Sequence, residues 1–205
     1  FTLNEFKIGD IFDEIIHLNS DELKSNHIKN NNSIFIDDFF RSGEIHESDI
    51  WINAAGNGDV QKSIANPELD YLLNYQLVHD ILEFKQKKSP NGVFIQLSSA
   101  AVYGNPYCLP IKENDATNPI TPYGEHKLLA EKICEKYANN YGLKSIILRP
   151  FSVYGAGQRK LFLWDLLTKL SSNTDSIQLF GTGNESRDFL HVDDLVSLIC
   201  ILILL

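Results

Sequence analysis

The chain has 205 residues, of which 43% are hydrophobic and 22% are charged, a composition typical of a globular protein with one large domain or slightly more. Its formal net charge of −9 argues against a nucleic-acid or anionic membrane surface as its partner. The three cysteines are far apart in the sequence. They predict neither a metal site nor a disulfide framework, so we expect a reducing, cytoplasmic setting.

The ends of the chain look incomplete. No Met is present, even at residue 1, and no signal peptide is visible, so we interpret the chain as a fragment. The apolar run at residues 195–205 is shorter than the roughly 20 residues that a membrane span needs. We therefore expect a buried helix that has been cut short, and no membrane partner.

Two short strands with acidic residues behind them are predicted near the N-terminus, at residues 13–18 and 33–36. Asp21 follows the first strand, and Asp38 follows the second. In dinucleotide-binding folds an acidic residue after the second strand of the complete sheet holds the adenosine ribose. With the first strand of such a fold lying before residue 1 or missing, the strand at 13–18 would be that second strand, and Asp21 in this role would favour NAD over NADP. A helix start that is capped by Ser20, with acids in its first turn, explains the same residues at least as well.

The middle of the chain alternates strands with helices. Residues 49–54 predict a strand that runs into Ala55 and Gly56, small residues that let a flat ligand approach the backbone. Residues 67–88 predict a helix with a proline in its first turn. Residues 93–97 predict a buried strand that ends at Ser98 and Ser99.

A second helix is predicted for residues 122–141, with Thr121 as its N-cap and Gly142 as its stop. Tyr123 and Lys127 are four residues apart, so they share one face of this helix. An ammonium beside a phenol lowers the pKa of the phenol, which would make Tyr123 a general acid or base. Taken alone, such a pair also recurs by chance on helix surfaces.

The remaining elements are a strand at residues 144–148, a helix at 162–170 and a last helix opened by acids at 193–194. Short apolar strands that alternate with helices predict an α/β fold, a Rossmann-type doubly wound parallel sheet covered on both faces. Its strands end at polar or small residues, where ligands of such sheets bind. The Gly-rich loop of a first βα unit is missing from the sequence.

Six segments in order resemble the extended short-chain dehydrogenases/reductases that act on nucleotide sugars, the NAD-dependent epimerase/dehydratase family. The resemblance runs from about residue 34 to residue 195. The segments are Asn53-Ala-Ala-Gly56; Ser63 with Pro67 and Asn74; Ser99-Ala-Ala-Val-Tyr-Gly104; Tyr123-x-x-x-Lys127; Arg149-Pro-Phe-Ser-Val-Tyr-Gly155; and Arg187-Asp-Phe-Leu-His-Val-Asp-Asp194.

The resemblance implies roles for individual residues. Tyr123 would be the catalytic acid/base, Lys127 would lower its pKa and hold the nicotinamide ribose, and Ser99 would bind the reacting oxygen of the sugar. The implied contacts with NAD, or alternatively NADP, are Asp38, Ala54, Ala55, Gly56, Ser98, Tyr123, Lys127 and Phe151.

The implied substrate is a nucleotide-diphosphate sugar. Arg187 would pair with the diphosphate, for which a guanidinium fork is well shaped, although a surface ion pair with Asp188 or Glu185 explains it as well. Ser152 stands where many family members have an Asn that contacts the substrate. The resemblance therefore does not predict which nucleotide and which sugar the protein binds.

Departures from the family pattern reduce the number of reaction types that we expect. Ala100 and Ala101 stand where dehydratases and decarboxylases usually carry an acid, which disfavours a dehydratase. The sequence of the segment Ser99–Gly104 is more similar to that of 4-epimerases. Asn53 stands where many epimerases have a His, and in this it is more similar to keto-sugar reductases. We expect an NAD-dependent 4-epimerase, with an NAD(P)H-dependent 4-keto-sugar reductase as the alternative and a non-catalytic dinucleotide-binding module as the third reading.

The resemblance also predicts the domain organisation. Residues 1–151 would form the NAD(P)-binding domain, without its N-terminal part. Residues 152–205 would begin the smaller substrate region, with residues 187–205 returning to the Rossmann core. Because dimers of the family often pair the helix that bears the catalytic Tyr, we also expect a homodimer.

Overall fold

A computed structural model describes residues 17–18, 33–34, 50–172, 176–179 and 181–204. The chain divides into two compact units between Arg149 and Pro150, and each is described by itself. Asp21 and Asp38 lie outside the described residues, so their predicted roles stay predictions.

Parallel strands form the first unit. The strands β3 (Trp51–Asn53), β4 (Val93–Leu97) and β5 (Lys144–Leu148) make a sheet in the order β3-β4-β5. Each pairs in parallel with its neighbour, and β1 (His17–Leu18) pairs in the same way with β2 (Ser33–Ile34). Parallel neighbours need a crossover connection, which the intervening helices supply. The predicted parallel α/β architecture is confirmed.

The crossover from β3 to β4 is one nearly continuous helical stretch. After the short helix α2 (Val60–Ala65) come α3 (Pro67–Tyr71), a π-helical turn η2 (Leu72–Gln76) and α4 (Leu77–Lys88). The side chain of Asn66 caps α3, and Pro67 occupies its first turn, where a missing N–H costs nothing. The predicted span 67–88 is confirmed, but the π turn inside it was not foreseen.

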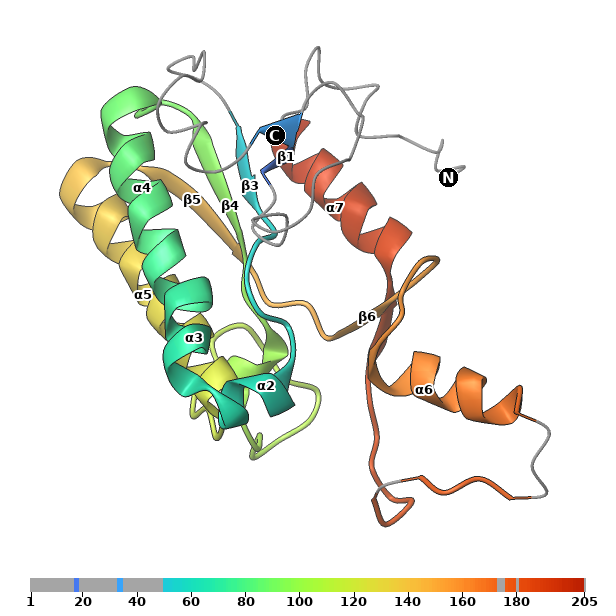
Figure 1. The fold of residues 1–205 in the computed structure, drawn as a ribbon. Coiled ribbons are helices and arrows are strands. Elements are labelled where there is room, and N and C mark those ends of the chain that lie inside the picture. The colour runs from blue at the N-terminus through green and yellow to red at the C-terminus, as the bar shows by residue number, and fades with distance from the viewer. Residues whose placement is uncertain (1–16, 19–32, 35–49, 173–175, 180, 205) are drawn as a thin grey trace. The chain divides into compact units, whose positions relative to one another are not determined.

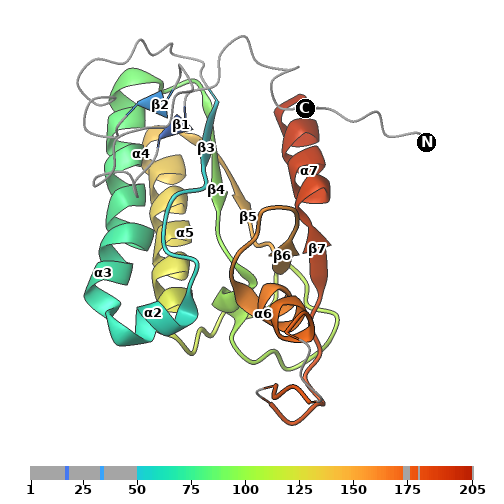
Figure 2. The ribbon, with the colours of Figure 1, turned by 45° about the vertical axis from the view of Figure 1, so that its right-hand side comes forward.

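The helix α5 (Pro122–Tyr141) connects β4 to β5 and has the predicted bounds. Thr121 accepts a hydrogen bond from the Gly124 N–H, and Gly142 ends the helix in the left-handed conformation. Figures 1 and 2 show α4 and α5 side by side along one face of the sheet. A hydrophobic core fills the space between them, made of Val78, Ile81, Leu82, Phe94, Ala130, Ile133, Cys134, Tyr137 and Leu143.

The second unit contains β6 (Ser152–Tyr154), α6 (Leu161–Leu170), β7 (Phe189–His191) and α7 (Val192–Leu204). The strands β6 and β7 pair in parallel, with Ser152 opposite Phe189. Asp193 and Asp194 lie in the first turn of α7, as the sequence predicted. In the described part of the chain, no helix combines the length and the apolar character that crossing a bilayer requires.

A buried ion pair joins α5 to the end of β5. The Glu131 carboxylate is 1% exposed and receives the Arg149 guanidinium in a two-pronged contact of 2.9 and 2.6 Å. The same carboxylate accepts a hydrogen bond from Ser98, and Arg149 also donates to the Tyr103 hydroxyl at 2.8 Å. These contacts hold the polar ends of β4 and β5 at a fixed distance from α5.

We expect Glu131→Ala to lower the free energy of unfolding by about 3 kcal/mol, because Arg149 and Ser98 would lose their buried acceptor. Chemical denaturation measures this change. Glu135→Ala removes an exposed acid from the same helix and should change stability by less than about 0.5 kcal/mol. Equal losses in the two variants would contradict a specific role for the buried pair.

Candidate functional site

The site begins where β4 ends. Ser98 donates its N–H to the Leu148 carbonyl, which continues the sheet for one residue. Ser99 then caps a 3₁₀ turn, η3 (Ala100–Tyr103), by accepting a hydrogen bond from the Ala101 N–H at 3.2 Å. This cap fixes the Ser99 hydroxyl at the carboxyl end of the strand, the edge where parallel sheets bind ligands.

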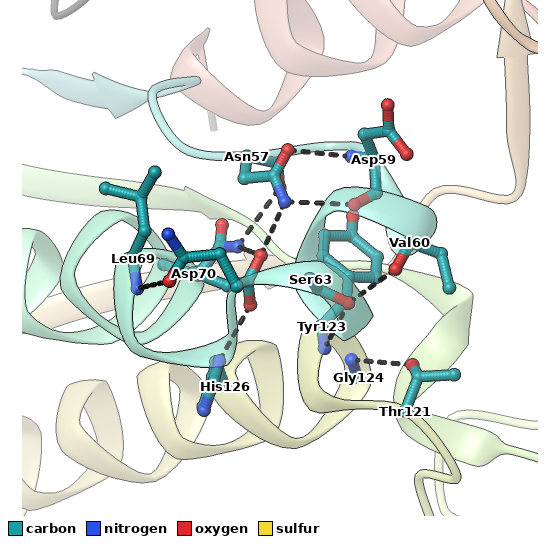
Figure 3. A network of polar contacts seen from close by, with 12 residues as sticks. Asn57, Asp59, Val60, Ser63, Leu69, Asp70, Thr121, Tyr123, Gly124 and His126 are labelled. Atoms are coloured by element: carbon teal, nitrogen blue, oxygen red, sulfur yellow. Dashed lines mark hydrogen bonds and ion pairs between the residues drawn. The ribbon is translucent and has the colours of Figure 1, made fainter.

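Tyr123 reaches the same edge from the first turn of α5. Its backbone N–H donates to the hydroxyl of Ser63, at 3.2 Å, and that fully buried hydroxyl donates in turn to the Val60 carbonyl. Figure 3 shows how α2 is tied in this way to the start of α5. The Tyr123 phenol hydrogen-bonds to the Ser99 side chain. Two residues that lie far apart in the sequence therefore meet at one point.

Lys127 completes the cluster one turn further along α5. Its side chain is buried, and its ammonium donates to the Leu97 carbonyl at 3.0 Å. The Nζ atom lies 5.9 Å from the centre of the Tyr123 ring. The structure thus brings together Ser99, Tyr123 and Lys127, the three residues that the sequence predicted to be catalytic.

Burial controls the charge states in this cluster. It raises the pKa of Tyr123, the Asp70 carboxylate raises it further, and the hydrogen bond with Ser99 opposes the shift. Burial lowers the pKa of Lys127 to about 8, and Asp70 opposes that shift. The net shift of the Tyr123 pKa is therefore upward, because loss of water around the phenol outweighs the hydrogen bond that favours the phenolate. The predicted lowering of this pKa by Lys127 stays a prediction.

A glycine allows α5 to approach this edge. A Cβ on Gly124 would lie 2.7 Å from the Ala101 carbonyl oxygen and 3.0 Å from the Cβ of Pro119. The first distance is shorter than any real Cβ contact, and the backbone cannot yield cheaply. Gly124 therefore sets how closely the Tyr123 turn packs against the Ser99 turn.

Ala54, Ala55 and Gly56 follow β3 and form a segment of small residues, which we call the ledge. Asn53 is buried, with its amide donating to Gln96 at 2.8 Å, and its oxygen accepts the Ala55 N–H. Ala54 and Gly56 are exposed. Gly56 has a φ of +131°, and a Cβ there would lie 2.5 Å from the Asn74 amide oxygen. An exposed backbone without a side chain fits a flat cofactor.

A family model described as "NAD dependent epimerase/dehydratase family" matches residues 15–204. The chain belongs to this family. It is 32% identical over 168 residues to a UDP-glucose 4-epimerase of Azospirillum brasilense, and 29% identical over 156 residues to a GDP-6-deoxy-D-mannose reductase of Pseudomonas aeruginosa. These alignments cover 74% and 73% of this chain, and 48% and 51% of the relatives.

Solved structures agree with this assignment. The UDP-glucose 4-epimerase of Brucella ovis in complex with NAD superposes with a TM-score of 0.65 at 30% identity, over 72% of this chain and 50% of that one. The Rossmann-type fold is therefore confirmed. The chain spans about half the length of the relatives it matches.

The other predicted contacts of the epimerase/dehydratase family lie in the second unit. Phe151 and Ser152 lead into β6, and the Ser152 N–H donates to the Asp188 carbonyl at 3.1 Å. Arg187 is exposed, and its guanidinium carbon lies 5.8 Å from the centre of the Phe162 ring. Within the described residues Arg187 forms no ion pair with Asp188 or Glu185, and the Glu185 carboxylate instead accepts backbone N–H groups of Thr182 and Gly183.

Sequence reasoning missed a buried carboxylate beside the cluster. Asp70 on α3 is 1% exposed and contacts His126, which directly precedes Lys127, at 2.7 Å. Its other oxygen accepts from Asn57 (Figure 3) and from Asn74. The one signal in the sequence was the spacing of four between Asp70 and Asn74, which places both on one face of a helix.

We expect Gly124→Ala to lower the free energy of unfolding by about 2 kcal/mol, the usual cost of overfilling a packed contact. The added methyl group would push the first turn of α5 away from Ala101. Thermal or chemical denaturation measures the change. Gly58→Ala is the control, because no atom lies within 4 Å of its Cβ position; an equally large loss at that site would refute the packing argument.

Proposed function

We propose that the full-length protein is an NAD-dependent nucleotide-sugar epimerase of the 4-epimerase type. The observation that carries the proposal is the meeting of Ser99, Tyr123 and Lys127 at the carboxyl end of β4. A phenol that hydrogen-bonds a serine hydroxyl, with an ammonium near its ring, suits proton exchange with a sugar hydroxyl. The named relatives are nucleotide-sugar epimerases and a nucleotide-sugar reductase, which supports the same substrate class.

In this proposal each residue of the cluster has one task. NAD, when bound, supplies the acceptor for the hydride that leaves the sugar carbon and returns to its other face. Tyr123 takes the proton from the sugar hydroxyl and gives it back after the keto sugar has turned over. Ser99 hydrogen-bonds the reacting oxygen in both forms. The Lys127 ammonium stabilises the phenolate whenever Tyr123 has lost its proton.

The cofactor would bind along the ledge after β3 and the end of β4. The proposed contacts are Ala54, Ala55, Gly56, Ser98, Tyr123 and Lys127, with Asp38 and Phe151 as further contacts. The exposed backbone at Gly56 supports this placement, because no side chain blocks the approach of a flat ring. NADP is the alternative cofactor.

Arg187 and Ser152 are the proposed substrate contacts. The Arg187 guanidinium is exposed, and within the described residues it forms no ion pair. A diphosphate would offer the pair of oxygens that its fork fits. Ser152 is the first residue of β6, and Arg187 lies just before β7, which pairs with β6. Both residues therefore fall in the same unit.

A reductase of 4-keto sugars is the second candidate. The raised pKa of Tyr123 favours the phenol, which is the form that donates a proton to a carbonyl oxygen. Asn53 adds support through its similarity to reductases. The two candidates share every residue and differ in whether the cofactor is regenerated within a cycle or consumed.

The test uses the full-length protein with a panel of UDP-, dTDP-, GDP- and CDP-sugars and 4-keto sugars. Nicotinamide absorbance is followed while NMR identifies the product. An isomerised sugar with no net change in NADH would establish the epimerase. Stoichiometric loss of NAD(P)H with a keto sugar would replace it with the reductase, and cofactor binding without any turnover would leave only a binding module.

Tyr123→Phe should reduce turnover by about 10²- to 10⁴-fold, the usual contribution of a positioned acid/base. The Phe ring keeps the shape of the side chain, so the dissociation constant of NAD should change little. Steady-state kinetics and isothermal titration separate the two effects. Tyr141→Phe removes an exposed hydroxyl from the same helix and should leave both values unchanged; normal turnover in Tyr123→Phe would rule out its proposed role.

A homodimer is the proposed assembly. Leu69 on α3, Leu72 on η2 and Leu129 on α5 are 49%, 49% and 38% exposed, so these adjoining elements present apolar side chains to their surroundings. We expect a dimer in sedimentation velocity runs of the full-length protein, and a shift to monomer in the double variant Leu72→Glu, Leu129→Glu. Leu109→Glu, in the loop before α5, should not dissociate it. A monomeric wild-type protein would contradict the proposal.

A further inference from the structure

The carboxylate of Asp70 is fully enclosed and fully hydrogen-bonded. Its Oδ1 accepts from the Asn57 amide at 2.6 Å and from the Asn74 amide at 2.9 Å, and its Oδ2 lies 2.7 Å from His126 Nδ1. The Asp70 side chain is 1% exposed and that of His126 is 12% exposed. Figure 3 shows Asn57, from the loop after β3, and His126, from α5, converging on the carboxylate. These contacts fix the position of the Asp70 carboxylate and of its negative charge.

That place adjoins the catalytic cluster. His126 lies between Tyr123 and Lys127 in the sequence of α5, and α3 packs against α5. Asn74, the second amide donor, also contacts the Asn57 carbonyl and faces the Gly56 ledge. The carboxylate is therefore linked to both sides of the proposed cofactor site, through α5 on one side and through the loop after β3 on the other.

Charges inside the protein act more strongly than charges in water. Other charged or titratable groups lie on the elements that pack around Lys127 and Asp70. They include Asp59 and Lys62 at α2, Glu68 and Tyr71 on α3, Tyr75 on η2, Tyr103 on η3, Glu125, His126, Glu131, Lys132, Cys134, Glu135, Lys136, Tyr137 and Tyr141 on α5, and Arg149 after β5. Among the described residues, Asp70 is the charged group that shifts the pKa of both Tyr123 and Lys127, upward in each case. Glu131 is neutralised by Arg149.

We propose that Asp70 is a positioning residue whose buried negative charge keeps Lys127 in its ammonium form, and that His126 holds the Asp70 carboxylate in place. Lys127 is buried and has only a neutral carbonyl as its hydrogen-bond acceptor among the described residues. Burial alone would drive off its proton. The Asp70 charge opposes that loss from a buried position. The consequence for catalysis rests on the proposed function; the consequence for Lys127 does not.

The direct test follows the titration of Lys127 by ¹³Cε NMR in lysine-labelled full-length protein, with Lys127→Arg used to assign the signal. The wild-type midpoint is expected at pH about 8. In Asp70→Asn, which keeps the size of the side chain and removes the charge, the midpoint should fall by about one pH unit, the lower end of the effect of a nearby opposite charge.

Two control variants separate charge from structure. Glu68→Gln removes an exposed negative charge from the same helix and should leave the Lys127 midpoint unchanged. His126→Asn offers an amide donor in place of Nδ1 and should keep the wild-type midpoint. Asp70→Ser removes the same charge, leaves room for a water molecule, and replaces Asp70→Asn should that variant fail to fold.

A second readout is the pH profile of turnover with the best sugar of the panel. The Asp70 charge raises the pKa of Tyr123 and of Lys127, so its removal lowers both. The two limbs of the profile, which report the protonation of these two groups, should both move to lower pH. A purely structural role for Asp70 would lower turnover at every pH and leave the limbs where they are.

Two outcomes would overturn the inference. One is a Lys127 midpoint that does not move in a folded Asp70 variant, and another is one that moves equally in Glu68→Gln. Absence of turnover with every sugar would remove the proposed function, whereas the NMR titration would still decide the role of Asp70.

Discussion

The site depends on how closely the first turn of α5 packs against the turn that follows β4. Gly124 leaves just enough space for the Ala101 carbonyl, and the Tyr123 N–H is anchored to Ser63 on α2. Three elements therefore determine the position of one phenol. A side chain held in this way loses little freedom on binding a substrate, which is why preorganised positions are effective in catalysis.

Close packing has an electrostatic consequence. The contacts that fix Tyr123 and Lys127 also remove water from them, and both pKa shifts follow from that burial: Tyr123 keeps its proton more firmly and Lys127 releases its proton more easily. Left to burial alone, the pair would become neutral, and a neutral lysine could not stabilise a phenolate. The protein therefore needs a compensating negative charge nearby, and Asp70 is the buried carboxylate whose charge acts on both groups.

Local signals allowed parts of the fold to be predicted from the sequence. Thr121, Pro122 and Gly142 specify the two ends of α5, and both were predicted correctly. The strands β4 and β5 are runs of apolar residues between turn signals, and their bounds were also correct. Each of these features depends on interactions within a few residues, which is the range that periodicity and capping rules can describe.

Features that depend on distant pairings were not predictable. The strands β6 and β7 have three residues each, and each is a strand only because the other lies beside it. Asp70 and His126 are 56 residues apart, and Ser63 and Tyr123 are 60 apart, so no local pattern announces either contact. The net upward shift of the Tyr123 pKa was not predictable for the same reason, since burial is a property of the packed fold.

The raised pKa of Tyr123 also bears on the choice between epimerase and reductase. A reductase needs the phenol once, as a donor, and burial already favours that form. An epimerase must first remove a proton with the same group, so in the ternary complex the phenolate has to become accessible near neutral pH. The Ser99 hydrogen bond offsets part of the desolvation of the phenol, and positive charge nearby can offset more of it. Lys127 is a cation that the protein places near the Tyr123 ring. Whatever keeps Lys127 protonated is therefore of greater consequence to an epimerase than to a reductase. The charge state of Lys127, which neither reaction changes, therefore matters to both candidate activities, and more to the epimerase.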